Sequence, residues 1–120
     1  MFYFTKDDIK YLHTKIIAKF GGSDGMREEG MLDSALSTPL QTFDSSVLYP
    51  SAIEKITRLS FGLVMNHGNK RIAAKVLDVG LSANNITLQA TNDEMIEEFI
   101  SLASDNIKYQ GFLTWTRSHI

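Results

Sequence analysis

The sequence contains no cysteine, only two prolines and a single tryptophan among its 120 residues. Without cysteine, neither a disulfide framework nor a thiolate metal site can form. The absence of disulfides fits the reducing cytosol, so we expect a cytoplasmic protein. No apolar run approaches the roughly 18 residues that a membrane span requires. Because the apolar opening at residues 1–4 also lacks the basic leader of a secretory signal, we expect no membrane partner.

An excess of basic charge is also missing. The chain has 12 basic and 14 acidic residues, which gives a formal net charge of −2. Domains that bind nucleic acid usually carry a basic stripe, so we expect no direct nucleic-acid contact. A hydrophobic content of 43% is ordinary for a globular protein, and 120 residues are enough for one core. We therefore expect a single domain over residues 1–120.

Apolar residues recur at helical spacing in segments that begin with good N-caps. Thr5 is predicted to cap the first helix, and the pairs Ser51/Glu54 and Thr91/Glu94 have the spacing of a capping box. The residues predicted to face inward from these three helices are Ile9, Leu12, Ile16 and Phe20; Ile53, Ile56, Leu59, Leu63 and Val64; and Met95, Ile96, Phe99, Ile100 and Ala103. The remaining histidines outside the motif below, His13 and His119, are expected at the surface or its rim.

Further helical patterns cover residues 31–36, 69–83 and 109–117, with loops expected at 21–30 and 38–50. Residues 85–89 alternate well enough to predict a short strand, paired with residues 2–4. The sequence therefore predicts an all-α protein, a bundle of about six helices with at most a short two-stranded β element.

The segment with most chemical content is residues 66–71, Asn-His-Gly-Asn-Lys-Arg, between two long helical patterns. Backbone N–H groups at a helix N-terminus lack partners, and the helix dipole is positive there. Lys70 and Arg71 add charge, so this segment predicts a small anion site suited to phosphate. His67, immediately before it, could act as a general base.

This segment resembles the motif of the Fic/Doc family, His-Pro-Phe-x-(Asp/Asn)-Gly-Asn-Lys-Arg. Residues 61–67 look like the family's approach to the histidine, and residues 68–73 look like the end of the motif and the next helix. The four residues Pro-Phe-x-(Asp/Asn) are missing between them. Residues 21–36, residues 48–50 and the two-helix tail after residues 85–88 are similar to the death-on-curing (Doc) branch of the family.

An alignment without a gap is the alternative. It places Leu63 at the position of the motif histidine and His67 at the acidic position. It loses the histidine, the phenylalanine and the match over residues 61–66, so we favour the gapped alignment. The intact motif is absent under either alignment.

The resemblance implies a role for each remaining motif residue. His67 would be the catalytic base, and the other four residues would bind nucleotide phosphate: Gly68, Asn69, Lys70 and Arg71. ATP and Mg²⁺ serve the intact family, but the Asp/Asn that would hold the metal is missing here. We therefore assign no metal ligand and expect binding of both to be impaired.

By the same resemblance, the chain is a bacterial death-on-curing toxin of a toxin–antitoxin pair. Its ancestor would have transferred phosphate or AMP from a nucleotide to a hydroxyl of a target protein in translation, and this chain would be inactive or impaired. The alternative is a non-catalytic Fic-fold module that binds an antitoxin or another protein. For the shortened connection we expect a frayed helix end, one continuous helix, or a domain-swapped dimer.

Overall fold

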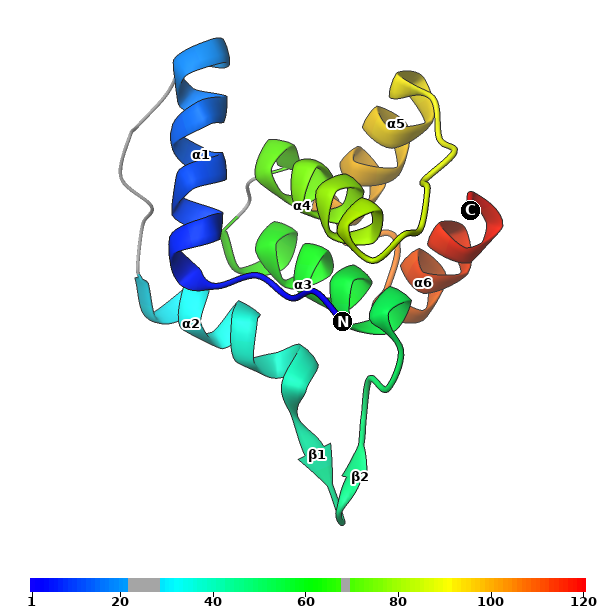
Figure 1. Cartoon of the computed structure of the whole chain (residues 1–120). Coiled ribbons are helices and arrows are strands. Elements are labelled where there is room, and N and C mark those ends of the chain that lie inside the picture. Colours follow the sequence, from blue (N-terminus) through cyan, green and yellow to red (C-terminus); the bar gives the residue numbers. More distant parts are fainter. Residues whose placement is uncertain (22–28, 68–69) are drawn as a thin grey trace.

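The computed structural model describes residues 1–21, 29–67 and 70–120, and only the backbone of residues 29, 31, 66 and 67. The described residues form six α-helices, one short 3-10 helix and one two-stranded hairpin (Figure 1). Their bounds are α1 Lys6–Phe20, α2 Glu29–Ser37, η1 Thr38–Leu40, β1 Thr42–Phe43, β2 Ser46–Val47, α3 Ala52–His67, α4 Lys70–Ala83, α5 Asn92–Ala103 and α6 Tyr109–Ser118. The predicted all-α bundle with a short two-stranded element is confirmed. None of these helices is both long and apolar enough to cross a membrane.

Helix α3 lies at the centre of the bundle and packs against α2, α4, α5 and α6 (Figure 1). Its predicted inner face is confirmed, because Ile56, Leu59 and Leu63 are fully buried and Val64 is nearly so. A helix that contacts four others must be apolar over much of its circumference. Accordingly, even the polar side chains Thr57 and Ser60 of α3 are buried.

Helices α3 and α4 lie side by side as a hairpin (Figure 1). The Ser60 hydroxyl of α3 donates a hydrogen bond of 2.8 Å to the Ala73 carbonyl of α4. In one uninterrupted helix, these two residues would lie about 20 Å apart. One continuous helix, among the outcomes expected for the shortened connection, is therefore wrong. The domain-swapped dimer stays a prediction.

The predicted helix starts are confirmed by reciprocal side-chain contacts. At α3, the Ser51 hydroxyl accepts from the Glu54 amide at 3.1 Å and donates to the Glu54 carboxylate at 2.8 Å. The capping box of Thr91 and Glu94 begins α5, and Thr5 caps α1 with Asp8 as its partner. Each box satisfies amide groups that the helix itself leaves without acceptors.

The predicted strand at residues 85–89, paired with residues 2–4, is wrong. Residues 86–90 form neither helix nor strand. The side-chain amide of Asn84 takes over the pairing, because its oxygen accepts from the Phe2 N–H at 2.9 Å and its nitrogen donates to the Phe2 carbonyl at 3.0 Å. The Asn84 side chain therefore makes with Phe2 the pair of hydrogen bonds that a strand partner would have made.

The β element lies instead within residues 38–50, where we expected a loop. Strands β1 and β2 pair antiparallel, and the two turn residues Asp44 and Ser45 have φ angles of 50° and 66°. Two successive positive φ values are typical of a type I′ turn, which normally carries Asn-Gly. The sequence signal was therefore weak. The other expected loop, residues 21–30, falls largely on residues 22–28, outside the described residues.

Two predicted inner faces need correction. On α5, Phe99 is buried, but Ile96 and Ile100 are 59% and 52% exposed and Ala103 is exposed too. The buried residues Glu98, Phe99 and Leu102 define the inner face of α5, and the three exposed residues lie on the side of Phe99 away from Glu98. The prediction assumed that every apolar residue faces the core. Buried residues are mostly apolar, but the converse does not hold, because many apolar residues lie at the surface.

On α1, His13 is 6% exposed and not at the surface as predicted, whereas Phe20 is 54% exposed. His13 lies one turn after the fully buried Ile9 and therefore shares its face. Phe20 is the last residue of the helix and extends beyond the packed core.

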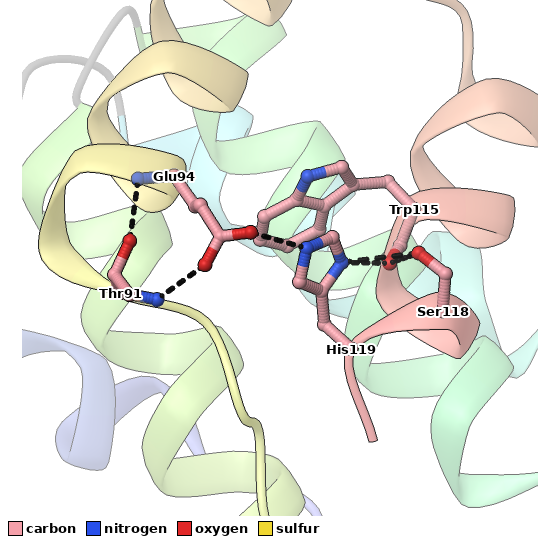
Figure 2. A network of polar contacts seen from close by, with 5 residues as sticks. All are labelled: Thr91, Glu94, Trp115, Ser118 and His119. Atoms are coloured by element: carbon pink, nitrogen blue, oxygen red, sulfur yellow. Dashed lines mark hydrogen bonds and ion pairs between the residues drawn. The ribbon is translucent and has the colours of Figure 1, made fainter.

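The C-terminal residues are fastened to α5 by a network around His119 (Figure 2). The imidazole Nδ1 lies 2.7 Å from the Trp115 carbonyl oxygen, and Nε2 lies 3.0 Å from a Glu94 carboxylate oxygen. A carbonyl and a carboxylate only accept, so both ring nitrogens must donate and the ring is best matched as imidazolium. Accordingly, the hydrogen bond to Trp115, supported by Glu94, raises the pKa of His119.

The close approach of α3 to α4 at Gly80 gives a first prediction. A Cβ added at Gly80 of α4 would lie 2.7 Å from Ile56 Cγ2 and 2.9 Å from Phe4 Cε2. We expect Gly80→Ala to lower the free energy of unfolding by about 1–3 kcal/mol because α3 and α4 must move apart. The control is Gly30→Ala, since Gly30 has open space around it. Equal effects of the two substitutions in urea unfolding would contradict this packing.

The network around His119 predicts a pH dependence. Because folding raises the pKa of His119, its protonation stabilises the fold fully at pH values below its pKa in the unfolded chain. This stabilisation is lost as pH rises through its pKa in the folded protein. Hydrogen bonds from Thr91, and the bond with His119, lower the pKa of Glu94. The stabilisation of the fold by the ionised Glu94 is therefore lost as pH falls through that lowered pKa. We expect the stability difference between the protein and His119→Gln to be largest near pH 6 and to shrink towards about pH 9. Urea unfolding of both proteins across this range measures it, and a constant difference would count against a charged His119.

Candidate nucleotide-phosphate site

The predicted site lies where α3 ends and α4 begins. His67 is the last residue of α3, and Lys70 and Arg71 are the first two residues of α4. Gly68 and Asn69 are outside the described residues, as is the side chain of His67. The structure therefore places the backbone of the predicted base three positions before the first residue of α4. It describes the side chains of Lys70 and Arg71 alone.

Core packing holds both helix ends in place. On the α3 side, Leu63 is fully buried and Val64 nearly so, within one turn of His67. On the α4 side, Ile72 and Ala73 are fully buried immediately after Arg71. Because each end is anchored this close to the junction, the direction of both helices at the site is determined by the bundle.

Helix α1 brings a third element to the site. The guanidinium carbon of Arg71 lies 4.7 Å from the ring centroid of Phe20, and Lys19 Nζ lies 5.4 Å from the same centroid. Phe20 thus holds two cations, one from α1 and one from α4, by cation–π contact. Lys19 could not be identified as a site residue from the sequence, because nothing in the sequence indicates that the end of α1 reaches the start of α4.

The charge at this end of α4 is positive. Lys70 and Arg71 are exposed, and the first turn of α4 contains no acidic residue. The N-terminal end of a helix already carries a partial positive charge, so two cations there cost about 0.3–1 kcal/mol each unless an anion is close. With Lys19 nearby, this arrangement is suited to a group with several negative charges, such as a polyphosphate.

The position that the ungapped alignment gives to the catalytic base has a different environment. Leu63 is fully buried on the inner face of α3. A group at this position faces the core, where no substrate can reach it.

The contact between α1 and α4 can be tested by a double-mutant cycle. We expect Phe20→Ala and Arg71→Ala to show a coupling of about 0.5–1 kcal/mol in the free energy of unfolding, because each substitution removes the same cation–π contact. A reference cycle on Tyr11 and Lys15 reports a comparable contact within α1 alone, where the distance is 5.3 Å. Additive effects at Phe20 and Arg71, with coupling at the reference pair, would contradict the approach of α1 to the site.

Comparison with known proteins gives one match. The family model described as Fic/DOC family matches residues 3–81, which span α1 to α4 and include the whole candidate site. No curated protein and no solved structure matches the chain. The match covers more than half of the chain, and the helical architecture agrees with it. The chain belongs to the Fic/DOC family.

Proposed function

We propose that this chain is a death-on-curing type toxin whose ancestor transferred phosphate, or AMP, from a nucleotide to a hydroxyl of a target protein. Its own activity is lost or impaired because the motif loop is four residues short. Membership of the Fic/DOC family indicates a nucleotide-transferring enzyme family. The finer assignment rests on the motif residues and their position.

One observation carries the proposal. His67 ends α3 and the basic pair Lys70/Arg71 begins α4, so the candidate base and the candidate phosphate site occupy adjoining helix ends. Phosphoryl transfer depends chiefly on positioning and on neutralising charge, which adjoining elements of this kind can provide. The burial of Leu63 further supports the gapped alignment, in which His67 is the base.

In the ancestral reaction, the His67 imidazole takes the proton of the target hydroxyl. The hydroxyl oxygen then forms a bond to the γ-phosphorus of ATP, the bond from that phosphorus to the bridging oxygen breaks, and ADP leaves. For AMP transfer, attack is on the α-phosphorus and pyrophosphate leaves. Lys70 and Arg71, with backbone amides of Gly68 and Asn69, would neutralise the charge on the phosphates.

The residues at this site do not fit Mg²⁺. The ion prefers carboxylate oxygens together with substrate phosphates, and the first turn of α4 contains no acidic residue. The missing Asp/Asn of the motif would have been that ligand. No residue of the site is therefore assigned to Mg²⁺, and the loss of this ligand is the reason for expecting impaired activity.

A second candidate function is a non-catalytic module that binds proteins through the Fic fold. The observation that favours it is the hairpin, where Phe43 is 74% exposed and Val47 and Leu48 are about half exposed. Neighbouring apolar side chains on a protruding hairpin mark a protein-contact surface. An antitoxin, or a target protein of the translation machinery, is the partner proposed for either function.

Restoring the loop tests the proposed function. We expect insertion of Pro-Phe-Ala-Asp between His67 and Gly68 to create Mg²⁺-dependent ATP binding in calorimetry. We also expect labelling of a protein in bacterial lysate with radioactive ATP, because the insertion returns the metal ligand and the loop length. The unaltered chain should show neither. Robust Mg²⁺-dependent labelling by the unaltered chain would contradict the impairment.

Matched variants identify which residues act. Insertion of four alanines should restore the length without the activity. In the Pro-Phe-Ala-Asp background, His67→Ala should abolish labelling but retain ATP binding, and Arg71→Gln should weaken ATP binding. Lys75→Gln, an equal change of charge one turn further along α4, should leave both unchanged. If the inserted chain folds and yet neither binds nor transfers, the proposal fails and the binding module is favoured.

A further inference from the structure

A cleft lies between α5 and α6, outside the segment that the family model matches. It has a volume of about 410 Å³, within the range of about 300–1,000 Å³ typical of small-molecule sites. The residues that line it are Glu94, Glu97, Glu98, Ser101, Ile107, Trp115 and His119. The first four follow one another at helical spacing, so a single face of α5 forms one wall.

The charge of this cleft is unbalanced. Three carboxylates line it, and no lysine or arginine of the described chain does so. Like charges three and four residues apart on a helix destabilise it, so this arrangement is costly in the free protein. The one cationic group is His119, and it is already engaged by Glu94 at 3.0 Å. His119 also interacts electrostatically with Glu98, so a single imidazolium faces three carboxylates and the cleft keeps an excess of negative charge.

Glu98 provides an independent indication of a ligand. Its side chain lines the cleft and the residue is 7% exposed, yet its Oε2 has no hydrogen-bond partner among the described residues. A buried carboxylate oxygen without a donor loses its hydration with no compensation, which costs several times more than an ordinary hydrogen bond contributes. Consistent with this environment, burial raises the pKa of Glu98. A cationic donor in the cleft would remove the cost.

The residues that line the cleft indicate which kind of cation it would bind. Among the described residues, no three histidine, aspartate, glutamate or cysteine side chains lie close enough to hold a metal ion. Ile107 and Trp115 add apolar surface beside the carboxylates, which suits the stem of an extended organic cation. A guanidinium group is planar, has five donors and is weakly hydrated, so it can serve two carboxylates in a half-buried site better than an ammonium can.

We propose that the α5–α6 cleft binds a guanidinium group, held by Glu97 and Glu98 with its stem against Trp115. The group is an arginine side chain of a polypeptide or a free alkylguanidine, and the chemistry of recognition is the same for both. The site is separate from the phosphate site and does not depend on the proposed transferase function.

Calorimetric titration of the whole chain tests the proposal. The probes are N-acetyl-arginine amide, agmatine and, as a neutral analogue of the same shape, N-acetyl-citrulline amide. We expect binding of at least one guanidinium probe and none of the citrulline probe. Binding of the capped arginine indicates a polypeptide side chain, and binding of agmatine alone indicates a small free guanidine. If neither binds, or if citrulline binds equally well, the proposal is overturned.

Variants locate the binding. Glu98→Gln should lower the affinity for the guanidinium probe about tenfold or more, because it removes a charge-assisted contact. Asp93→Asn makes the same change of charge on an exposed residue of α5 outside the cleft and should leave affinity within about twofold. Equal affinity of Glu98→Gln and the unaltered chain would overturn the proposal.

Thermal unfolding separates binding from a purely structural role. Without ligand, Glu98→Gln should be as stable as the unaltered chain or more so, since a neutral amide relieves the buried charge. Ser101→Arg should carry a tethered guanidinium into the cleft, raise the melting temperature and prevent binding of the probes. A lower melting temperature for Ser101→Arg, with probe affinity unchanged, would contradict a guanidinium site.

Discussion

The packing of α3 against α4 is the contact on which the rest of this structure depends. Gly80 lets α4 approach Ile56 of α3, and the hydrogen bond from Ser60 to Ala73 joins the middle of α3 to the first part of α4. These contacts, and the buried residues Leu63 and Ile72, set how the end of α3 lies relative to the start of α4. The position of the candidate phosphate site therefore follows from core packing.

The molecule carries opposite charge at two separate places. The start of α4 gathers Lys70 and Arg71 with Lys19 of α1 near the Phe20 ring, whereas the α5–α6 cleft gathers Glu94, Glu97 and Glu98 around the single His119. A net charge of −2 conceals both, because the two cancel in the sum. Each place departs from what stability alone would favour, since cations stand at a helix N-terminus and carboxylates crowd one helix face. Such departures are where binding is expected.

Errors of sequence interpretation fell where tertiary contacts replaced regular patterns. Residues 85–89 alternate as a strand does, but the Asn84 side chain pairs with Phe2 directly and these residues form no strand. The hairpin turns through Asp44 and Ser45, without the glycine that usually announces such a turn. Ile96 and Ile100 satisfy helical periodicity and still face outward, because Glu98 and Phe99 set the inward direction of α5.

The sequence by itself determined the helices, their caps and the motif residues from His67 to Arg71, because periodicity, capping boxes and motif spacing are local along the chain. It also carried the resemblance that places the chain in its family. Only the tertiary structure decided that α1 brings Lys19 and Phe20 to the start of α4. It also decided that Glu98 Oε2 is buried without a hydrogen-bond partner among the described residues, in a cleft that Trp115 also lines. Those juxtapositions join residues far apart in sequence, and they depend on how the helices rotate and pack, which no local pattern specifies.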